Sequence, residues 1–61
     1  MVKIGDQVTF VIVGGKELKA EVTQVWSQHC INLLAEDGTH GSSIMRVDYF
    51  PTKPSGNYWK P

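Results

Sequence analysis

The order of apolar and polar residues along this chain predicts short β-strands separated by turns. Residues 7–13, QVTFVIV, are almost all β-branched or aromatic, and in an extended strand their side chains alternate between two faces. Gly14 and Gly15 follow, and a glycine pair adopts the positive φ angles of a tight hairpin without steric cost. We therefore predict a first strand over 7–13 that turns back at this glycine pair.

The return segment favours a strand over a competing helix. Apolar and polar side chains alternate over residues 17–26, ELKAEVTQVW. A helix over 16–25 is the alternative, because lysine, glutamate, leucine and alanine have high helix propensity. The β-branched and aromatic ending from Val22 to Trp26 argues against that helix. We predict a second strand over 17–26.

A second hairpin is predicted farther along the chain. The polar connection 27–29 leads into an apolar run over 30–35, and Asp37-Gly38 then supplies the strongest short-range hairpin signal of the sequence. We expect the partner strand over 39–47. Gly41 inside this strand predicts a β-bulge or a close approach of the backbone to a neighbour.

The C-terminal part of the chain changes character. Residues 49–56 contain two prolines and a glycine and predict a loop, whereas 57–61, NYWKP, carry two adjacent aromatics that we expect to pack back as a short last strand. Four or five short antiparallel strands, opening with IGDQV at 4–8, predict an all-β fold. We expect a small SH3-like antiparallel barrel that occupies residues 1–61 as a single domain, with an open curled sheet as the alternative.

The length of the chain raises the question of how so small a domain is stabilised. A chain of 61 residues buries only about 60% of the surface that its unfolded form exposes. Domains of this size often rely on disulfides, a metal or self-association. Cys30 is the single cysteine, so no disulfide forms within one chain. We therefore expect the protein to self-associate as a homo-oligomer.

The charge and the apolar runs narrow the classes of partner and location. Six Lys and Arg balance six Asp and Glu, whereas proteins that bind duplex nucleic acid usually carry a basic excess. We expect no duplex nucleic acid as partner. The first residues do not read as a signal peptide, and the longest apolar run, 10–13, is too short to cross a membrane. We expect a soluble cytoplasmic protein without a membrane contact.

The residues that most often carry chemistry do not form a catalytic or metal-binding pattern. The soft metal ligands are His29, Cys30 and His40, whereas structural zinc needs four, and adjacent residues on a strand point to opposite faces. The same geometry argues against a Cys–His nucleophile pair. Gly14-Gly15-Lys16 lacks the pattern of a phosphate-binding loop. We predict no enzyme activity, no metal and no cofactor.

Aromatic and amide side chains are the candidates for a binding site. Trp26, Tyr58 and Trp59 either line a barrel rim, where flat rings stack on a base or a proline-rich peptide, or fill the core. Asn32 lies in an apolar run, where an amide is costly unless it finds partners, so it is either a structural corner or the floor of a site. We expect Arg46 to point outward, where it is either an ordinary solvated arginine of the strand or a partner for an anionic ligand. The candidate ligand-binding residues are Trp26, Asn32, Ser42, Ser43, Arg46, Tyr58 and Trp59.

Part of the sequence resembles a known group of proteins. The features that carry the resemblance are Val25-Trp26, Cys30, Asn32-Leu33, Asp37-Gly38, Ser43-Ile44 and the terminus at 56–61. Over residues 20–61 the chain resembles small SH3-like barrel proteins encoded by tailed phages, in which a Val-Trp strand end precedes Cys-Val-Asn-Leu, an Asp-Gly turn and an aromatic C-terminus. It departs from them at Gln28, where an acid is common, at Ser42 in place of threonine, and at Lys60 between Trp59 and Pro61.

The resemblance implies a source rather than a mechanism. With a phage source, we expect a non-enzymatic binding protein in the host cytoplasm. The first hypothesis is a counter-defence protein that sequesters a nucleotide-derived immune signal in a pocket formed by an oligomer. The alternatives are a module that docks a host or virion protein and a nucleic-acid-binding barrel, against which the zero net charge weighs.

Overall fold

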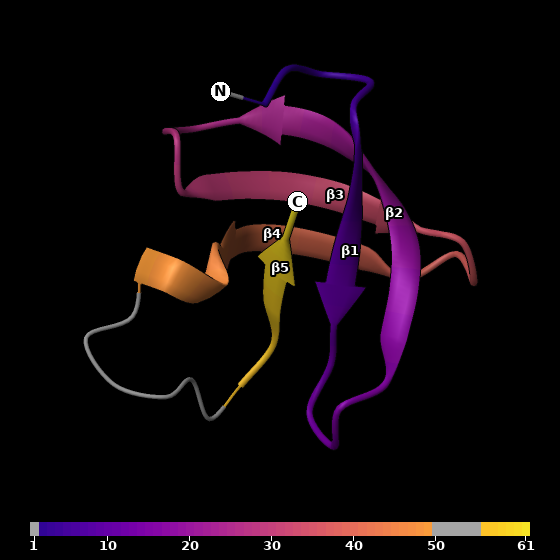
Figure 1. The fold of residues 1–61 in the computed structure, drawn as a ribbon. Coiled ribbons are helices and arrows are strands. Elements are labelled where there is room, and N and C mark those ends of the chain that lie inside the picture. The colour runs from indigo at the N-terminus through magenta and orange to yellow at the C-terminus, as the bar shows by residue number, and fades with distance from the viewer. Residues whose placement is uncertain (1, 50–55) are drawn as a thin grey trace.

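The protein is an all-β domain whose single sheet curls into a partly closed barrel (Figure 1). The structure, a computed structural model, describes residues 2–49 and 56–61. Its elements are β1 (Gln7–Val11), β2 (Glu17–Val25), β3 (Cys30–Ala35), β4 (His40–Met45), a 3-10 turn η1 (Val47–Tyr49) and β5 (Tyr58–Lys60). The strand order is β4-β3-β2-β1-β5, and neighbouring strands are antiparallel. The predicted small SH3-like antiparallel barrel is confirmed.

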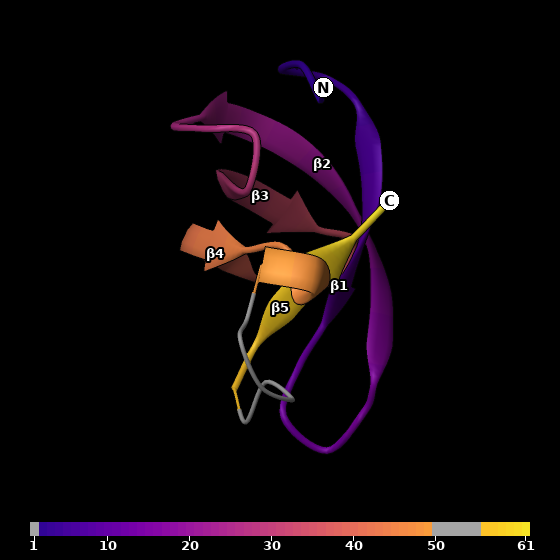
Figure 2. The same ribbon diagram turned by 60° about the vertical axis from the view of Figure 1, so that its left-hand side comes forward.

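The barrel closes only where the two outer strands meet. A parallel bridge joins Arg46, just after β4, to Trp59 on β5. Figure 2 shows the sheet from the side, with β5 and η1 lying together across the curled strands. Elsewhere β4 and β5 diverge, so the molecule is a curled half-barrel rather than a continuous cylinder.

The strands differ from their predicted bounds at the turns. The first strand ends at Val11 instead of residue 13, because the hairpin already begins at Ile12, whose N–H donates to the carbonyl of Lys16 at 3.0 Å. Gly14 and Gly15 have φ angles of 98° and 91°, as the hairpin prediction requires. The competing helix over 16–25 is wrong, since β2 alternates between buried and exposed residues. The fourth strand ends at Met45 instead of residue 47 and gives way to η1.

The core is formed by alternate residues of four strands. The concave side of the sheet gathers the buried apolar side chains, and Trp59 from β5 is the largest of them. Burial removes these side chains from water and supplies most of the stability of so small a domain. The cluster consists of Val8, Phe10, Leu18, Ala20, Val22, Ile31, Leu33, Ala35 and Trp59.

A β-bulge in β4 shapes the surface beside the third strand. Ile31 pairs with Ile44 and Leu33 pairs with Gly41, so two residues of β4, Ser42 and Ser43, lie opposite the single residue Asn32. Gly41 is buried, and a Cβ atom there would lie 2.9 Å from side-chain carbons of both Leu33 and Ile44. Both features predicted from Gly41, a bulge and a close backbone approach, are therefore present.

Candidate functional site

The corner between β2 and β3 holds an exposed tryptophan in a defined orientation. Trp26 follows β2, and its main-chain N–H and that of Ser27 donate to the carbonyl of Cys30 at 2.9 and 3.1 Å. The Ser27 hydroxyl accepts hydrogen bonds from the main-chain N–H groups of His29 and Cys30. The Trp26 side chain is 59% exposed, yet its indole Nε1 donates to Oδ1 of Asn32 at 2.9 Å. The corner therefore presents the indole to solvent with its polar edge already bonded.

Asn32 joins this corner to the β4 bulge. Its Oδ1 accepts a second hydrogen bond, at 2.8 Å, from the main-chain N–H of Ser43. Ser43 has a φ of 53°, in the left-handed region of backbone conformation that residues other than glycine rarely adopt. The amide of Asn32 thus satisfies the bulge and orients Trp26 at once, which is the role expected of a structural corner. We call Trp26, Asn32, Ser42 and Ser43 the Trp26 surface.

Trp59 does not belong to this surface: it lies in the core, one of the two places that the sequence left open for this ring, and it offers no exposed face to a ligand. It is fully buried, and its Nε1 donates to the carbonyls of His29 at 3.1 Å and Ile44 at 3.0 Å. The His29 carbonyl also accepts from the main-chain N–H of Arg46 at 2.7 Å. Trp59, which lies on β5, therefore connects this strand to the corner after β2 and to the end of β4.

Tyr58, which precedes Trp59 on β5, is half-buried and pairs with Val11 of β1. Among the described residues, no hydrogen bond or ring contact joins Tyr58 to Trp26. The structure therefore does not bring the three predicted aromatics together on one rim.

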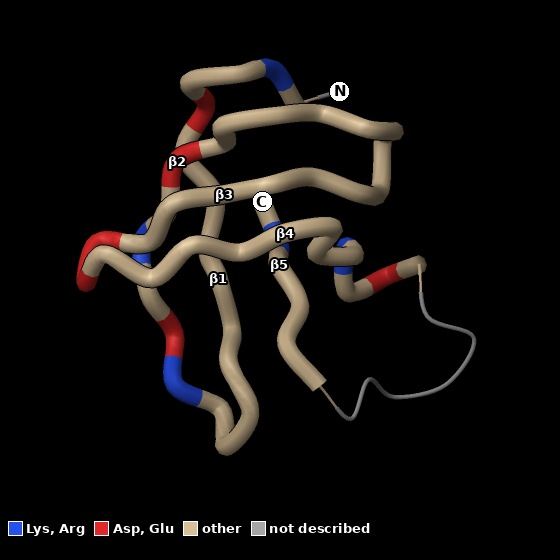
Figure 3. Tube along the Cα trace, turned by 180° about the vertical axis from the view of Figure 1, so that it is seen from behind, with Lys and Arg blue, Asp and Glu red and all other residues tan. Residues whose placement is uncertain are grey.

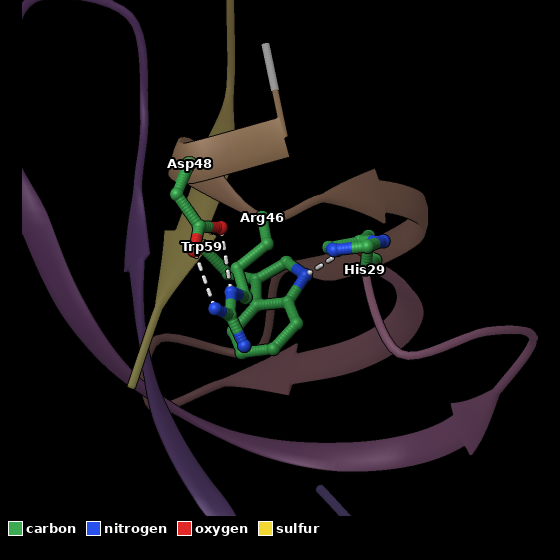
Figure 4. Close-up of polar contacts among 4 residues, drawn as sticks. All are labelled: His29, Arg46, Asp48 and Trp59. Atoms are coloured by element: carbon green, nitrogen blue, oxygen red, sulfur yellow. Dashed lines mark hydrogen bonds and ion pairs between the residues drawn. The ribbon is translucent and has the colours of Figure 1, made fainter. Parts of the chain in front are cut away.

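Arg46 directs its charge to a partner within the chain instead of toward an anionic ligand. Its Nε donates to Oδ1 of Asp48 at 2.6 Å, and Nη2 pairs with Oδ2 of the same carboxylate. Figure 4 shows this bidentate pair beside the Trp59 indole, whose ring centroid lies 6.0 Å from Cζ of Arg46. The hydrogen bond from Arg46 lowers the pKa of Asp48 below its ordinary value. Because this cation is already neutralised, Arg46 is a poor anchor for a phosphate.

A pair of rings that the sequence did not indicate lies at the same end of the molecule. The rings of His29, from the corner after β2, and Tyr49, from η1, have centroids 4.7 Å apart and planes tilted by 42°. Tyr49 is 52% exposed. These residues are twenty positions apart, and no local pattern predicts their contact, which exists only because η1 folds against the corner (Figure 1).

The outer face of the sheet carries a separate shallow depression of about 320 Å³. Charged and polar side chains of β1, β2 and the β3–β4 turn surround Leu34 there, and Figure 3 shows acidic positions gathered along this flank. None of the predicted site residues lines it. Its lining residues are Gln7, Lys19, Ala20, Glu21, Leu34, Ala35 and Glu36.

The described part of the chain contains no group of three His, Cys, Asp or Glu side chains placed to hold a metal. Within that same part, no helix has the length and apolar character needed to cross a bilayer. No protein family, curated protein or solved structure matches the chain significantly.

Proposed function

We propose that this protein is a non-catalytic recognition module that binds an extended segment of another protein on the Trp26 surface. The observation that carries this proposal is that Trp26, a residue 59% exposed, has its indole held by a 2.9 Å hydrogen bond to Asn32. Single exposed apolar side chains are common, but a tryptophan fixed by a partner loses little conformational freedom when a ligand covers it. Tryptophan is also the residue type most enriched among energetically dominant contacts of protein interfaces.

The surroundings of Trp26 favour a protein segment over a charged ligand. Asn32, Ser42 and Ser43 are uncharged. Arg46, whose main-chain N–H donates to the carbonyl of His29 in the same corner, is paired with Asp48. A polyproline-type segment is uncharged along its backbone, is preformed, and stacks its rings on aromatic side chains. The exposed Tyr49, whose ring contacts His29 of the same corner, offers a second ring to such a segment. Given the phage resemblance of the sequence, we propose that the partner is a host or virion protein.

A nucleotide-derived immune signal is the second candidate. The observation in its favour is that the exposed serines at 42 and 43 lie beside the amide that orients Trp26, an arrangement suited to a base and a ribose. The ion pair of Arg46 weighs against it, because phosphate binding would first have to break that pair. The Trp26 surface is also open, so a small molecule would need a second copy of the chain to enclose it. This candidate therefore depends on the expected homo-oligomer.

Binding measurements with one variant and one control test the proposed function. Titration calorimetry would use proline-rich peptides, cyclic dinucleotides and ADP-ribose with the wild type, Trp26→Ala and Val13→Ala. Val13 is 69% exposed in the β1–β2 hairpin and serves as an exposed apolar control remote from the corner. We expect peptide binding that Trp26→Ala abolishes and Val13→Ala preserves. Binding of the nucleotides alone would favour the second candidate, and silence across the panel would reject both.

A further inference from the structure

The Asn32 side chain uses both acceptor lone pairs of its oxygen within the chain, whereas the two N–H donors of its nitrogen make no hydrogen bond to a described residue. An asparagine amide offers two lone pairs on Oδ1 and two N–H donors on Nδ2. Both lone pairs are used, by the Trp26 indole at 2.9 Å and by the Ser43 main-chain N–H at 2.8 Å. Because both of these partners are donors, the atom that faces them must be the oxygen, and the orientation of the amide follows from chemistry alone.

The nitrogen of the same amide is therefore available to a ligand. No hydrogen bond joins Nδ2 of Asn32 to another described residue. No buried side-chain nitrogen or oxygen in the described part of the chain lacks a partner. Nδ2 is therefore not fully sealed from solvent, and it belongs to the planar group whose oxygen already contacts the exposed Trp26 indole. The Trp26 surface combines a flat apolar ring with adjacent hydrogen-bond donors.

We infer that Asn32 determines the specificity of this surface by donating from Nδ2 to a carbonyl oxygen of the bound segment. The inference rests on the proposed function and names its ligand class: a proline-bearing segment whose ring stacks on Trp26 while a neighbouring carbonyl accepts from Asn32. Proline suits both demands, since it has an apolar ring and its peptide group carries a carbonyl but no N–H. The indole N–H of Trp26 cannot serve as the donor, because Asn32 already occupies it.

A change of one atom in Asn32 tests this assignment. Asn32→Asp retains an oxygen that accepts from Trp26 and Ser43 but replaces the two N–H donors with a second oxygen. Asn57→Asp is the matched control, because Asn57 also uses its Oδ1 to accept a main-chain N–H, that of Val13 at 2.9 Å, and gains the same charge. The probe is acetylated octaproline amide. We expect Asn32→Asp to bind it about tenfold more weakly and Asn57→Asp to bind it like the wild type.

A second measurement in the wild type does not depend on how well the variant folds. In nitrogen–proton correlation spectra, octaproline should shift the side-chain NH2 signals of Asn32 and leave those of Asn57 in place. If these Asn32 signals do not move, or if Asn32→Asp binds normally while Trp26→Ala does not, the donor role is wrong and the proposed function stands. If octaproline does not bind the wild type, the inference is rejected, and the proposed function then depends on the other peptides of the panel. Asn32-dependent binding of uridine instead would overturn the proline assignment.

Discussion

At the scale of single residues, the two tryptophans differ in the acceptor of the indole N–H, and this difference accompanies their different positions on the surface and in the core. Trp26 donates to a side chain, Asn32, and leaves its ring in solvent. Trp59 donates to two main-chain carbonyls and is fully buried. Both follow apolar or β-forming residues in sequence, so composition alone does not distinguish them. The Trp26 surface and the closure of the barrel therefore both use an indole N–H as donor, one to a side chain and the other to the main chain.

Substitution of the two tryptophans by phenylalanine should have unequal effects on stability. Trp59→Phe keeps a large ring in the core but leaves the carbonyl of Ile44 without the indole donor, and we expect a loss of about 1–3 kcal/mol. Trp26→Phe removes an exposed contact and should cost no more than about 0.5 kcal/mol. Urea unfolding followed by circular dichroism measures both. Equal losses would contradict the different roles assigned here.

At the scale of elements, the β3–β4 hairpin depends on two glycines for different physical reasons. Gly38 has a φ of 91° with open space around its Cα, so only its backbone conformation demands glycine. Gly41 instead packs against Leu33 and Ile44 at distances that exclude a Cβ atom. The turn at Gly38 therefore requires glycine for its backbone conformation. The bulge that follows Gly41 requires glycine because of packing.

Alanine and asparagine should differ in their effect on stability at the two glycines: asparagine should be the less destabilising at Gly38 and the more destabilising at Gly41. At Gly38, asparagine tolerates the left-handed conformation better than alanine, which should cost about 1–2 kcal/mol. At Gly41, asparagine should be worse than alanine, because the larger side chain meets Leu33 and Ile44. Thermal unfolding of the four variants gives the ranking. The same order at both positions would show that one mechanism acts at both.

The ion pair that links the end of β4 to η1 should make stability depend on pH. The hydrogen bond from Arg46 lowers the pKa of Asp48 from 3.8 in the folded protein. A depressed carboxyl pKa contributes stability that is fully present above the unfolded value and is lost as pH falls through the folded value. Wild type should therefore exceed Asp48→Asn in stability at neutral pH, and the difference should vanish in acid.

The unfolding midpoints of the wild type and Asp48→Asn, measured from neutral to strongly acidic pH, test this prediction. Asp37 has a lowered pKa because Thr39 hydrogen-bonds its side chain, so both proteins share that background. A difference between the two proteins that is constant from neutral to strongly acidic pH would exclude the ion pair as its cause.

At the scale of the whole molecule, the C-terminal strand completes a barrel that the first four strands leave open. β5 pairs with β1, contributes Trp59 to the core, and forms the bridge to Arg46. An ion pair between Lys60 and Glu17, with 2.9 Å between Nζ and Oε2, adds a contact to β2. A three-residue strand thereby connects both ends of the sheet.

Removal of this strand should abolish the cooperative fold. A chain that ends at Gly56 lacks β5 and exposes the buried faces of Phe10 and Val11, so we expect no cooperative thermal transition and no near-ultraviolet dichroism. Deletion of Pro61 alone is the control, since this exposed residue follows β5 and should leave the transition unchanged. A cooperative transition in the shorter chain would show that β1–β4 fold without the closing strand.

The alternation along the chain was sufficient to predict the strands and their hairpins. Gly14-Gly15 and Asp37-Gly38 turn where their conformational freedom indicated, and Gly41 marks the bulge. These features are local, because side-chain period and backbone φ depend on a few neighbouring residues. The same local rules predicted that Asn32 needs partners, without identifying Trp26 and Ser43 as those partners.

Which candidate residues share a surface depends on how distant parts of the chain pack together. The curl of the sheet brings η1 and β5 against the corner after β2. Trp59 is buried as a result, Arg46 is paired with Asp48, and the Tyr49 ring lies against that of His29. It leaves Trp26 outside, oriented by Asn32. The strands, the turns and the alternating faces could be predicted from the residue pattern, apart from the exact strand ends, because they follow from short-range sterics. The meeting of distant faces depends on sheet curvature and closure, which are properties of the packed molecule as a whole.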